Sequence, residues 1–164
     1  MSSIPNPLPA DPAVLAGYLR AMETARAYTF TIDQRDWRGY AALFGTEVTI
    51  DYKPRKPGIP TDRIPSAEWV EGAMHSLGEI EATHHMFLPY GVTFEGERAT
   101  VFSHCAAHHF DTRVMGDQAF TEHATYRHVL RPGDGPAGWL IDEVHAEVLW
   151  SVGNRAVLYR KMEG

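Results

Sequence analysis

The chain reads Ala82-Thr83-His84-His85-Met86-Phe87 at one point and Ala106-Ala107-His108-His109-Phe110 further on, so two histidine pairs lie in apolar, strand-like surroundings. Successive side chains of a strand point to opposite faces, so only one histidine of each pair can enter a given pocket. Histidine is the side chain best suited to move protons near neutral pH. We therefore expect one histidine from each pair to line a common pocket.

The sequence around these pairs predicts a run of strands. Strands are expected at about 83–88, 91–95, 99–110, 119–131 and 139–150, because apolar and β-branched residues fill these segments. Turns that contain glycine separate the longer ones, at Glu95-Gly96-Glu97, at Met115-Gly116-Asp117 and over residues 131–138. Strands joined in sequence by short turns form an antiparallel sheet, and a long, strongly twisted sheet curls around its neighbours.

Helices are expected before these strands. Asp11-Pro12 supplies an N-cap and a proline at the first helical position, and apolar residues at helical spacing continue to about residues 30–32. Asp36 can cap a second, short helix that ends at Gly45, and Pro65-Ser66 begins a third. Between them, alternation predicts a strand over residues 47–52, and the proline-rich segment 53–65 reads as a loop. Helices first and strands afterwards predict an α+β fold.

Length and composition favour one soluble domain. The chain has 164 residues, of which 44% are hydrophobic and 22% charged. We expect an extended N-terminal segment over residues 1–10, one domain over 11–154 and a C-terminal tail over 155–164. The formal net charge of −6 argues against nucleic acid or an anionic membrane as a partner. A single cysteine excludes an intrachain disulfide, and without a signal peptide or a membrane-length apolar run we expect a cytoplasmic protein.

Asp33 and Tyr52 are the residues that we expect beside the histidines. Asp33 follows Met22 by eleven positions, close to three helical turns, so it falls near the inward face at the end of the first helix. A carboxylate at a helix C-terminus is unfavourable for the helix dipole, which suggests a separate purpose. Tyr52 shares a strand face with Ile50, so both face the core if either does.

Other chemistries fit the sequence less well. His104 and His108 are four apart on a strand, about 13 Å, which is too far for both to bind one metal ion. Neither a CxxC nor an HExxH pattern is present, so no metal site is predicted. Cys105 has apolar neighbours that raise a thiol pKa. Ser103 lacks the glycine-flanked elbow of a serine hydrolase.

Several segments together resemble a known family. Thr31-Ile32-Asp33-Gln34-Arg35-Asp36-Trp37, Ile50-Asp51-Tyr52, Thr83-His84-His85-Met86, the strand with the second histidine pair, and Trp150-Ser151-Val152-Gly153-Asn154 resemble the SnoaL-like branch of the NTF2-like superfamily, with scytalone dehydratase as the most similar pattern. The likeness spans roughly residues 15–154. It implies a cone of helices packed into a strongly curved, mostly antiparallel sheet around a pocket, and commonly a dimer or trimer.

The resemblance also implies an activity. The dehydratase removes water from a β-hydroxy ketone without a cofactor. An aspartate there orients one histidine, a second histidine transfers protons, and tyrosines hold a water that polarises the carbonyl. By position, Asp33, Tyr52 and His85 match three of these residues, and the second histidine matches His109 or His108. Strand alternation alone does not decide between the last two, because the inward face is not known from the sequence.

Three positions depart from the family pattern. Ile32 stands where a second carbonyl-polarising tyrosine is expected, and Ala124 and Tyr126 replace a serine and an asparagine. Tyr126 or Tyr28 are candidates to supply the missing hydroxyl. The residues that we expect to contact a substrate are Tyr28, Ile32, Trp69, Phe87, Tyr126 and Trp150.

The sequence therefore favours a cofactor-free lyase that dehydrates a small hydrophobic hydroxylated carbonyl compound. His85 is the expected general acid and base, Asp33 the group that holds the histidine of the second pair, and Tyr52 the donor to the developing enolate oxygen. A polyketide cyclase or ketosteroid-type isomerase of the same fold is the second reading. A non-catalytic small-molecule binding module is the third, because fold does not fix function. A hydrogen bond between Asp33 and a histidine nitrogen would favour catalysis over binding.

Overall fold

The computed structural model describes residues 8–54 and 62–159. The elements in chain order are α1 (Pro12–Asp33), α2 (Trp37–Ala41), β1 (Phe44–Lys53), β2 (Arg63–Pro65), α3 (Ser66–Leu77), β3 (Ala82–Glu95), β4 (Arg98–Phe110), β5 (Ala119–Pro132), β6 (Trp139–Gly153) and α4 (Ala156–Tyr159). In this part of the chain, no helix is both long and apolar enough to cross a membrane.

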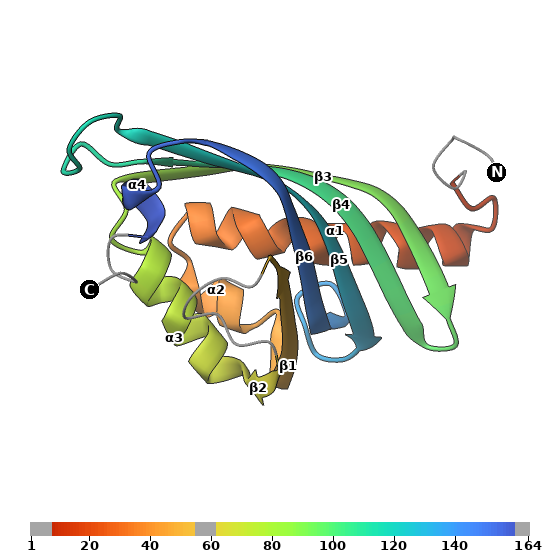
Figure 1. The fold of residues 1–164 in the computed structure, drawn as a ribbon. Coiled ribbons are helices and arrows are strands. Elements are labelled where there is room, and N and C mark those ends of the chain that lie inside the picture. The colour runs from red at the N-terminus through yellow and green to blue at the C-terminus, as the bar shows by residue number, and fades with distance from the viewer. Residues whose placement is uncertain (1–7, 55–61, 160–164) are drawn as a thin grey trace.

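The six strands form one curved sheet in the order β2-β1-β6-β5-β4-β3. The strand β1 runs parallel to β6, and the other neighbours are antiparallel. Figure 1 shows the long strands β3 to β6 arching over α1, with α2 and α3 on the same side of the sheet. This arrangement confirms the predicted α+β class, in which helices pack into a curved, mostly antiparallel sheet.

Helix α1 begins and ends where the sequence predicts. The Asp11 side chain accepts hydrogen bonds from the backbone N–H groups of Ala13 at 2.8 Å and Val14 at 3.1 Å, and Pro12 occupies the first helical position. The inward face of the helix carries small and aromatic residues, and the helix ends at Asp33. Because its C-terminus meets β3, the last residue of α1 lies beside the first histidine pair.

Four segments differ from the sequence prediction. The strands expected at 83–88 and 91–95 are one strand, β3, with an irregularity between Pro89 and Gly91. Helix α2 ends before Phe44, which begins β1. The segment expected to be a loop contains β2, paired with β1, although its residues 55–61 lie outside the described part. The expected C-terminal tail contains the short helix α4, because Val157 and Tyr159 are buried against the domain.

The expected N-terminal segment is described only from residue 8 onward, where residues 8–10 form no helix or strand. The core lies between α1 and the concave face of the sheet, and it contains Tyr28, Tyr40, Ile50, Val101 and Val144. Its aromatic members pack edge to face, as Tyr40 does against Phe44 with ring centroids 5.2 Å apart. The wider, helix-covered end of this core is hollow and forms the cavity considered below.

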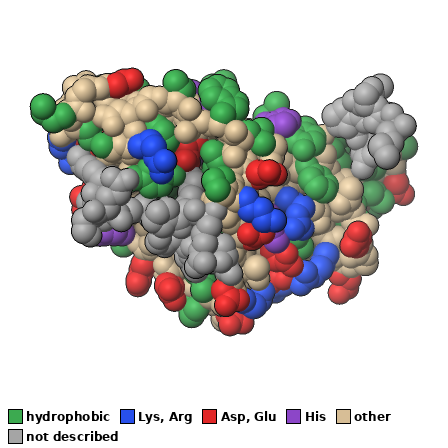
Figure 2. Space-filling model, viewed as in Figure 1, with side chains coloured by type: hydrophobic (Ala, Val, Ile, Leu, Met, Phe, Trp, Pro, Cys, Tyr) green, Lys and Arg blue, Asp and Glu red, His purple; other side chains and the backbone are tan. Residues whose placement is uncertain are grey.

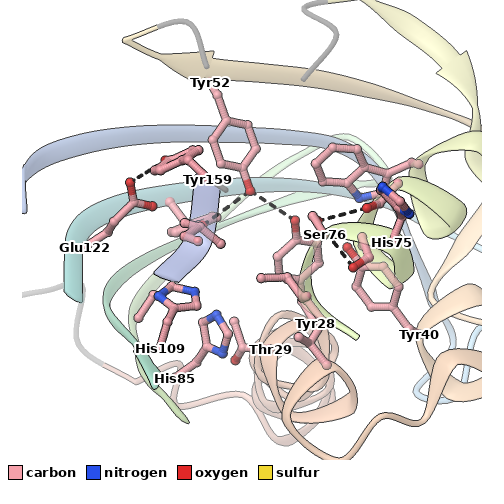
Figure 3. Close-up of a pocket in the computed structure, with 18 of the residues that line it drawn as sticks. Tyr28, Thr29, Tyr40, Tyr52, His75, Ser76, His85, His109, Glu122 and Tyr159 are labelled. Carbon is pink, nitrogen blue, oxygen red and sulfur yellow. Dashed lines mark hydrogen bonds between the residues drawn. The ribbon is translucent and has the colours of Figure 1, made fainter. Parts of the chain in front are cut away.

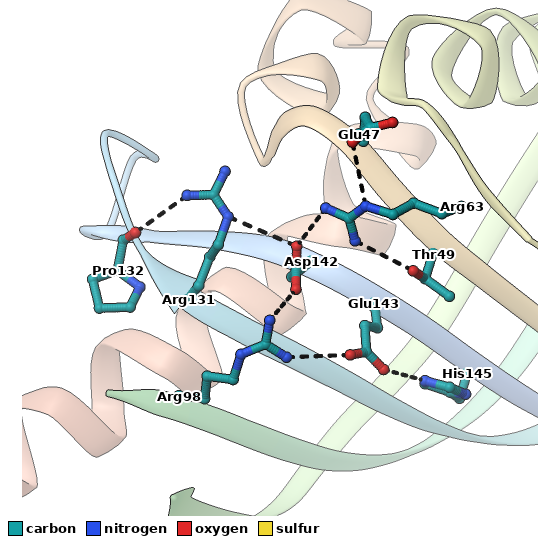
Figure 4. A network of polar contacts seen from close by, with 9 residues as sticks. All are labelled: Glu47, Thr49, Arg63, Arg98, Arg131, Pro132, Asp142, Glu143 and His145. Atoms are coloured by element: carbon teal, nitrogen blue, oxygen red, sulfur yellow. Dashed lines mark hydrogen bonds and ion pairs between the residues drawn. The ribbon is translucent and has the colours of Figure 1, made fainter. Parts of the chain in front are cut away.

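Charged side chains gather on the side of β6 that lies opposite the cavity. Asp142 is buried, and its carboxylate accepts hydrogen bonds from Arg98 at 2.6 Å and Arg63 at 3.2 Å, while the Arg131 guanidinium lies 3.7 Å away (Figure 4). Figure 2 shows blue and red side chains mixed over this region, with hydrophobic side chains elsewhere on the same face. A buried carboxylate is stable here because three cations surround it.

Candidate active site

The helices and the concave face of the sheet enclose a cavity of about 440 Å³. Its walls come from the four helices and from β1, β2, β3, β4 and β5. Figure 3 shows two histidines at one side of this cavity and several tyrosines around the rest. A concave, mostly apolar pocket with a few convergent polar groups is typical of a small-molecule site.

Asp33 and His85 form a hydrogen-bonded pair at the edge of this cavity. The Nδ1 atom of His85 lies 2.6 Å from Oδ1 of Asp33, and the two side chains are 7% and 14% exposed. The backbone N–H of His85 donates to the other carboxylate oxygen at 2.7 Å. An ionised carboxylate only accepts, so Nδ1 carries a proton and Nε2 of a neutral ring is free to act as a base.

Thr83 and Arg35 hold the Asp33 carboxylate in place. The Thr83 hydroxyl donates to Oδ1 of Asp33 at 2.8 Å, and Arg35 donates to the Thr83 oxygen at 2.7 Å. The same guanidinium donates to the carbonyls of Ile32 and Ile80, so it ties the end of α1 to the start of β3. Arg35 has φ of 56°, an uncommon left-handed conformation that ends the helix and turns the chain.

The pKa of Asp33 reflects two opposing effects. Burial favours the neutral acid, but the hydrogen bonds and charge of His85, together with the Thr83 hydroxyl, outweigh burial and lower the pKa below its ordinary value. Asp33 is therefore ionised at neutral pH. A fixed negative charge at Nδ1 stabilises the imidazolium that forms when His85 accepts a proton at Nε2.

Of the second histidine pair, the structure places His109 in the cavity and His108 on the outer face. The rings of His85 and His109 are close to perpendicular, with centroids 5.8 Å apart, and the His109 Nδ1 atom lies 3.3 Å from the carbonyl oxygen of Phe120. His108 instead lies beside His84 with ring centroids 6.1 Å apart, and its Nδ1 atom is 3.0 Å from the Thr121 hydroxyl.

The expected partnership of Asp33 with the second histidine pair is wrong. Asp33 contacts His85 of the first pair instead, because the C-terminus of α1 abuts β3, the edge strand, whereas β4 lies one strand further into the sheet. His108 is likewise excluded from the cavity by strand alternation, since its neighbour His109 points inward. The carboxylate of Asp33 therefore contacts His85 directly, and His85 is the histidine expected to transfer protons.

Three tyrosine hydroxyls meet across the cavity from the histidines. The Tyr52 hydroxyl lies 3.3 Å from that of Tyr28 (Figure 3). It also lies 3.4 Å from the hydroxyl of Tyr126. Burial raises the pKa of all three phenols. They therefore remain protonated donors at neutral pH, suited to hold a carbonyl oxygen. Ile32 has no hydroxyl to replace the tyrosine that the family pattern has at its position, and Tyr28 and Tyr126 both supply hydroxyls in its place.

The structure brings four of the six expected substrate-contact residues to the cavity and leaves two out. Tyr28, Ile32, Trp69 and Tyr126 line it. Phe87 shares the inward face with His85 but packs into the core, with its ring centroid 5.7 Å from that of Tyr126.

Trp150 lies on the outer face, because the strand pairing between β5 and β6 shifts by one residue there. Ala124 pairs with Val148, whereas the adjacent His123 pairs with Trp150, so the alternation along β6 reverses at Leu149. Trp150 is 54% exposed and stacks on His123 with ring centroids 3.6 Å apart. Neither Phe87 nor Trp150 is positioned to touch a ligand in the cavity.

Glu122 and Tyr159 complete the cavity wall, and the sequence reasoning missed both. The Tyr159 hydroxyl donates to Oε1 of Glu122 at 2.7 Å, from α4 to β5. Burial and the charge of Glu122 raise the pKa of Tyr159. Glu122 alternates in step with Phe120 and Ala124 along β5, so the strand pattern could have shown that it points inward. Tyr159 reaches the cavity through a contact between segments far apart in the sequence, and no local pattern indicates it.

The described side chains were also searched for a set of metal ligands. Within residues 8–54 and 62–159, no group of three or more His, Cys, Asp or Glu side chains is arranged to hold a metal ion. What the described side chains can do in the cavity is move a proton through His85, with Asp33 behind it, and hold an oxygen atom with tyrosine hydroxyls.

A family model supports the resemblance in the sequence. The SnoaL-like domain model matches residues 15–145. The chain belongs to the SnoaL-like family. Among curated protein sequences, none shows significant similarity to this SnoaL-like chain.

Solved structures show the same NTF2-like fold at low sequence identity. The Kfla4162 protein of Kribbella flavida is 21% identical, with a TM-score of 0.74 over 87% of this chain and 95% of that one. A candidate scytalone dehydratase from Novosphingobium aromaticivorans is 18% identical, with a TM-score of 0.68 over 83% and 87%. A LinA-type3 hexachlorocyclohexane dehydrochlorinase from Novosphingobium barchaimii is 10% identical, with a TM-score of 0.63 over 83% and 88%.

Proposed function

We propose that the protein is a cofactor-free lyase that removes water from a small hydrophobic hydroxylated carbonyl compound. The observation that carries this proposal is the 2.6 Å contact between Asp33 and Nδ1 of His85 at the edge of a cavity that also holds tyrosine hydroxyls. A module that only binds a ligand has no need of a carboxylate that orients a histidine. Dehydratase and dehydrochlorinase neighbours of the same fold support elimination chemistry.

The proposed step begins with proton abstraction. Nε2 of His85 takes the proton from the carbon next to the substrate carbonyl, and the electron pair of that C–H bond moves to form an enolate. The enolate oxygen accepts hydrogen bonds from the phenol cluster around Tyr52, directly or through water. The Asp33 carboxylate stabilises the imidazolium that results, because its charge lies at the other ring nitrogen.

Elimination follows when the enolate electrons return. The carbon–carbon double bond forms, the bond to the β-hydroxyl breaks, and the hydroxyl leaves as water with the proton that His85 had taken. His109 lies beside His85, with ring centroids 5.8 Å apart, and would relay this proton to the leaving group. One proton and one hydroxyl leave the substrate, so no oxidant, reductant or metal is needed.

The experiment is a mass measurement on hydroxylated cyclic ketones incubated with the enzyme. Dehydration lowers the mass of the product by that of one water. A product of unchanged mass would favour the isomerase reading instead, which a ketosteroid isomerase-like neighbour of the same fold also supports. In the same assay, His85→Ala should lower kcat by about 10²–10⁴-fold, the contribution of a well-placed acid–base group. Full activity of His85→Ala would refute the assignment.

A further inference from the structure

The outer face of the sheet, opposite the cavity, carries an exposed apolar patch. The large hydrophobic side chains that project from it on β3 and β6 are each 37–63% exposed, namely Met86, Leu88, Tyr90, Leu149, Trp150 and Val152. In Figure 2, green and purple side chains lie along the upper edge of the molecule, where Figure 1 places the outer face of the long strands. We call these six residues, with the outward side chains of β4 and β5 between them, the outer patch. Proteins that act as single chains rarely expose a contiguous apolar patch of more than a few hundred Å².

The outer patch has a groove and a projecting side chain on the same surface. Met86, Ala106, His123 and Trp150 are paired in register across β3, β4, β5 and β6. A groove lies between Met86 and His123, where Ala106 has only a short side chain. Trp150 stands beside the groove, stacked on His123 and 54% exposed, and the irregularity in β6 adds Leu149 next to it. A two-fold interface joins the same surface of two copies, so a projection and a hollow on one patch can fill each other.

The size and charge of the outer patch fit a second copy of this chain. Four strands about 4.8 Å apart, over about eight residues of roughly 3.3 Å each, cover a flat area of about 500 Å². Projecting side chains make the accessible surface larger, so it approaches the roughly 800 Å² that each partner buries in a stable complex. Of the described outward side chains over residues 82–90, 102–110, 119–125 and 149–152, none is Asp, Glu, Lys or Arg. Two copies can therefore meet here without like-charge repulsion at neutral pH.

Histidines make this face sensitive to pH. Four of them lie on the outer patch, namely His84, His104, His108 and His123. Burial, and then the charges of neighbouring histidines, lower the pKa of His108 below its ordinary value. The titratable and charged side chains around it are His84 and His123 on the patch, His85 on the cavity side, and Arg127 and Glu147 at the next outward positions of β5 and β6. Protonation therefore places several positive charges together on an otherwise apolar surface.

We propose that the outer patch joins two copies of this chain in a two-fold dimer, which dissociates when its histidines are protonated. Trp150 and Leu149 of one copy fill the groove beside Ala106 of the other. Neutral imidazoles pack against apolar side chains in this interface, whereas imidazolium ions would lose their hydration and face like charges from both copies. The dimer is therefore stable above the ordinary pKa of histidine and dissociates as the pH falls below it. The proposal is independent of the proposed function.

Sedimentation equilibrium on the full chain tests the dimer directly. At pH 8.0 and micromolar concentration, the wild type should have the mass of two chains. The mass of one chain would overturn the proposal. If that single chain also binds to neutral phosphatidylcholine vesicles, the outer patch would belong to a lipid surface instead.

Two exposed leucines on different surfaces provide matched variants. Leu88 on the outer patch is 63% exposed, and Leu19 on α1 is 52% exposed. Leu88→Asp puts a negative charge from each copy into the interface, so Kd should rise at least about 10²-fold, whereas Leu19→Asp should leave Kd unchanged. Trp150→Ala removes the aromatic anchor and should raise Kd about tenfold or more. Circular dichroism checks that each variant is folded. A wild-type Kd in either folded patch variant would overturn the proposal.

The pH dependence of Kd tests the histidines. Histidine ordinarily titrates near pH 6.5, so each imidazole that must stay neutral in the dimer weakens association about fourfold at pH 6.0. Several act together, so Kd should rise more than about tenfold between pH 8.0 and pH 6.0. The double variant His84→Gln, His108→Gln should show a smaller rise. The control His145→Gln, at a histidine that contacts Glu143 and Asp51 beyond the patch, should keep the wild-type rise. A smaller rise than tenfold in the wild type, or an equal rise in the double variant, would overturn the proposal.

Discussion

The carboxylate of Asp33 binds His85 twice, through the ring Nδ1 at 2.6 Å and through the backbone N–H at 2.7 Å. The first contact fixes the tautomer of the ring and the second fixes the strand that carries it. Because Asp33 is the last residue of α1, the end of one helix determines both where His85 lies and which of its nitrogens can take a proton.

Asp33→Asn should lower kcat by about 10²–10⁴-fold and change KM little. The amide can present N–H to Nδ1, which would put the proton on the wrong ring nitrogen, and it carries no charge to stabilise the imidazolium. Steady-state kinetics with the hydroxylated substrate measures both parameters. The matched control is Asp36→Asn, which keeps an N-cap for α2 and lies outside the cavity. A kcat close to wild type in Asp33→Asn would contradict the role.

The two adjacent histidines on β4 should behave differently. His109→Gln should reduce kcat at least tenfold, because it removes the second proton carrier beside His85. His108→Gln should leave kcat unchanged, since His108 lies on the outer face of the sheet. Circular dichroism on both variants checks that the fold is intact. The reverse pattern, loss in His108→Gln alone, would mean that the outer face carries the activity.

Tyr52→Phe should lower kcat by about 10²-fold, the order found when one donor to a developing oxyanion is removed. The Tyr52 hydroxyl is the member of the cluster that contacts both Tyr28 and Tyr126, so its loss breaks both contacts. The change in KM should be smaller. If KM rises while kcat stays constant, Tyr52 binds the substrate without favouring the transition state.

His128 should make the fold sensitive to mild acid. The ring is fully buried between aromatic side chains, and burial lowers its pKa from 6.5 to about 3. In the unfolded chain, His128 binds a proton once the pH falls below the ordinary pKa. In the folded chain, it binds one only when the pH falls below the lowered pKa. The free energy of unfolding therefore falls as the pH drops from the first value to the second. Above pH 6.5 this group has no effect.

The acid sensitivity can be measured by denaturant unfolding. Near pH 5, His128 alone should remove about 2 kcal/mol of stability relative to pH 7. His128→Phe should make this loss smaller by about that amount, whereas the control His104→Phe, at an exposed histidine, should keep the wild-type dependence. Identical pH dependence in His128→Phe and wild type would show that the folded protein already protonates this ring.

Local patterns were enough to predict most of the elements that build the site, although not α4. The Asp11-Pro12 signal begins α1, helical spacing brings Asp33 to its inward face, and alternation places Tyr52 beside Ile50 in the interior. Each of these depends on residues a few positions apart. The family resemblance added the choice of His85 within the first pair.

What the sequence did not reveal depends on long-range register. His109 faces inward because of the pairing of β3 with β4, and no short segment determines which face of the sheet meets α1. Trp150 turns outward because one extra residue in β6 reverses the alternation. The contact of Asp33 with His85 in place of the second pair follows from which strand lies at the sheet edge.

Tyr159 bears on how the protein is made, because the ribosome adds it after all six strands of the sheet. When β6 has emerged, the strands with both histidine pairs can be assembled, but the wall formed by α4 is still missing. Ligand binding by a nascent chain would therefore lag behind the formation of the Asp33–His85 contact. A bulky fusion placed directly after Tyr159 would sit at the same wall, so an N-terminal tag is preferable for the assays above.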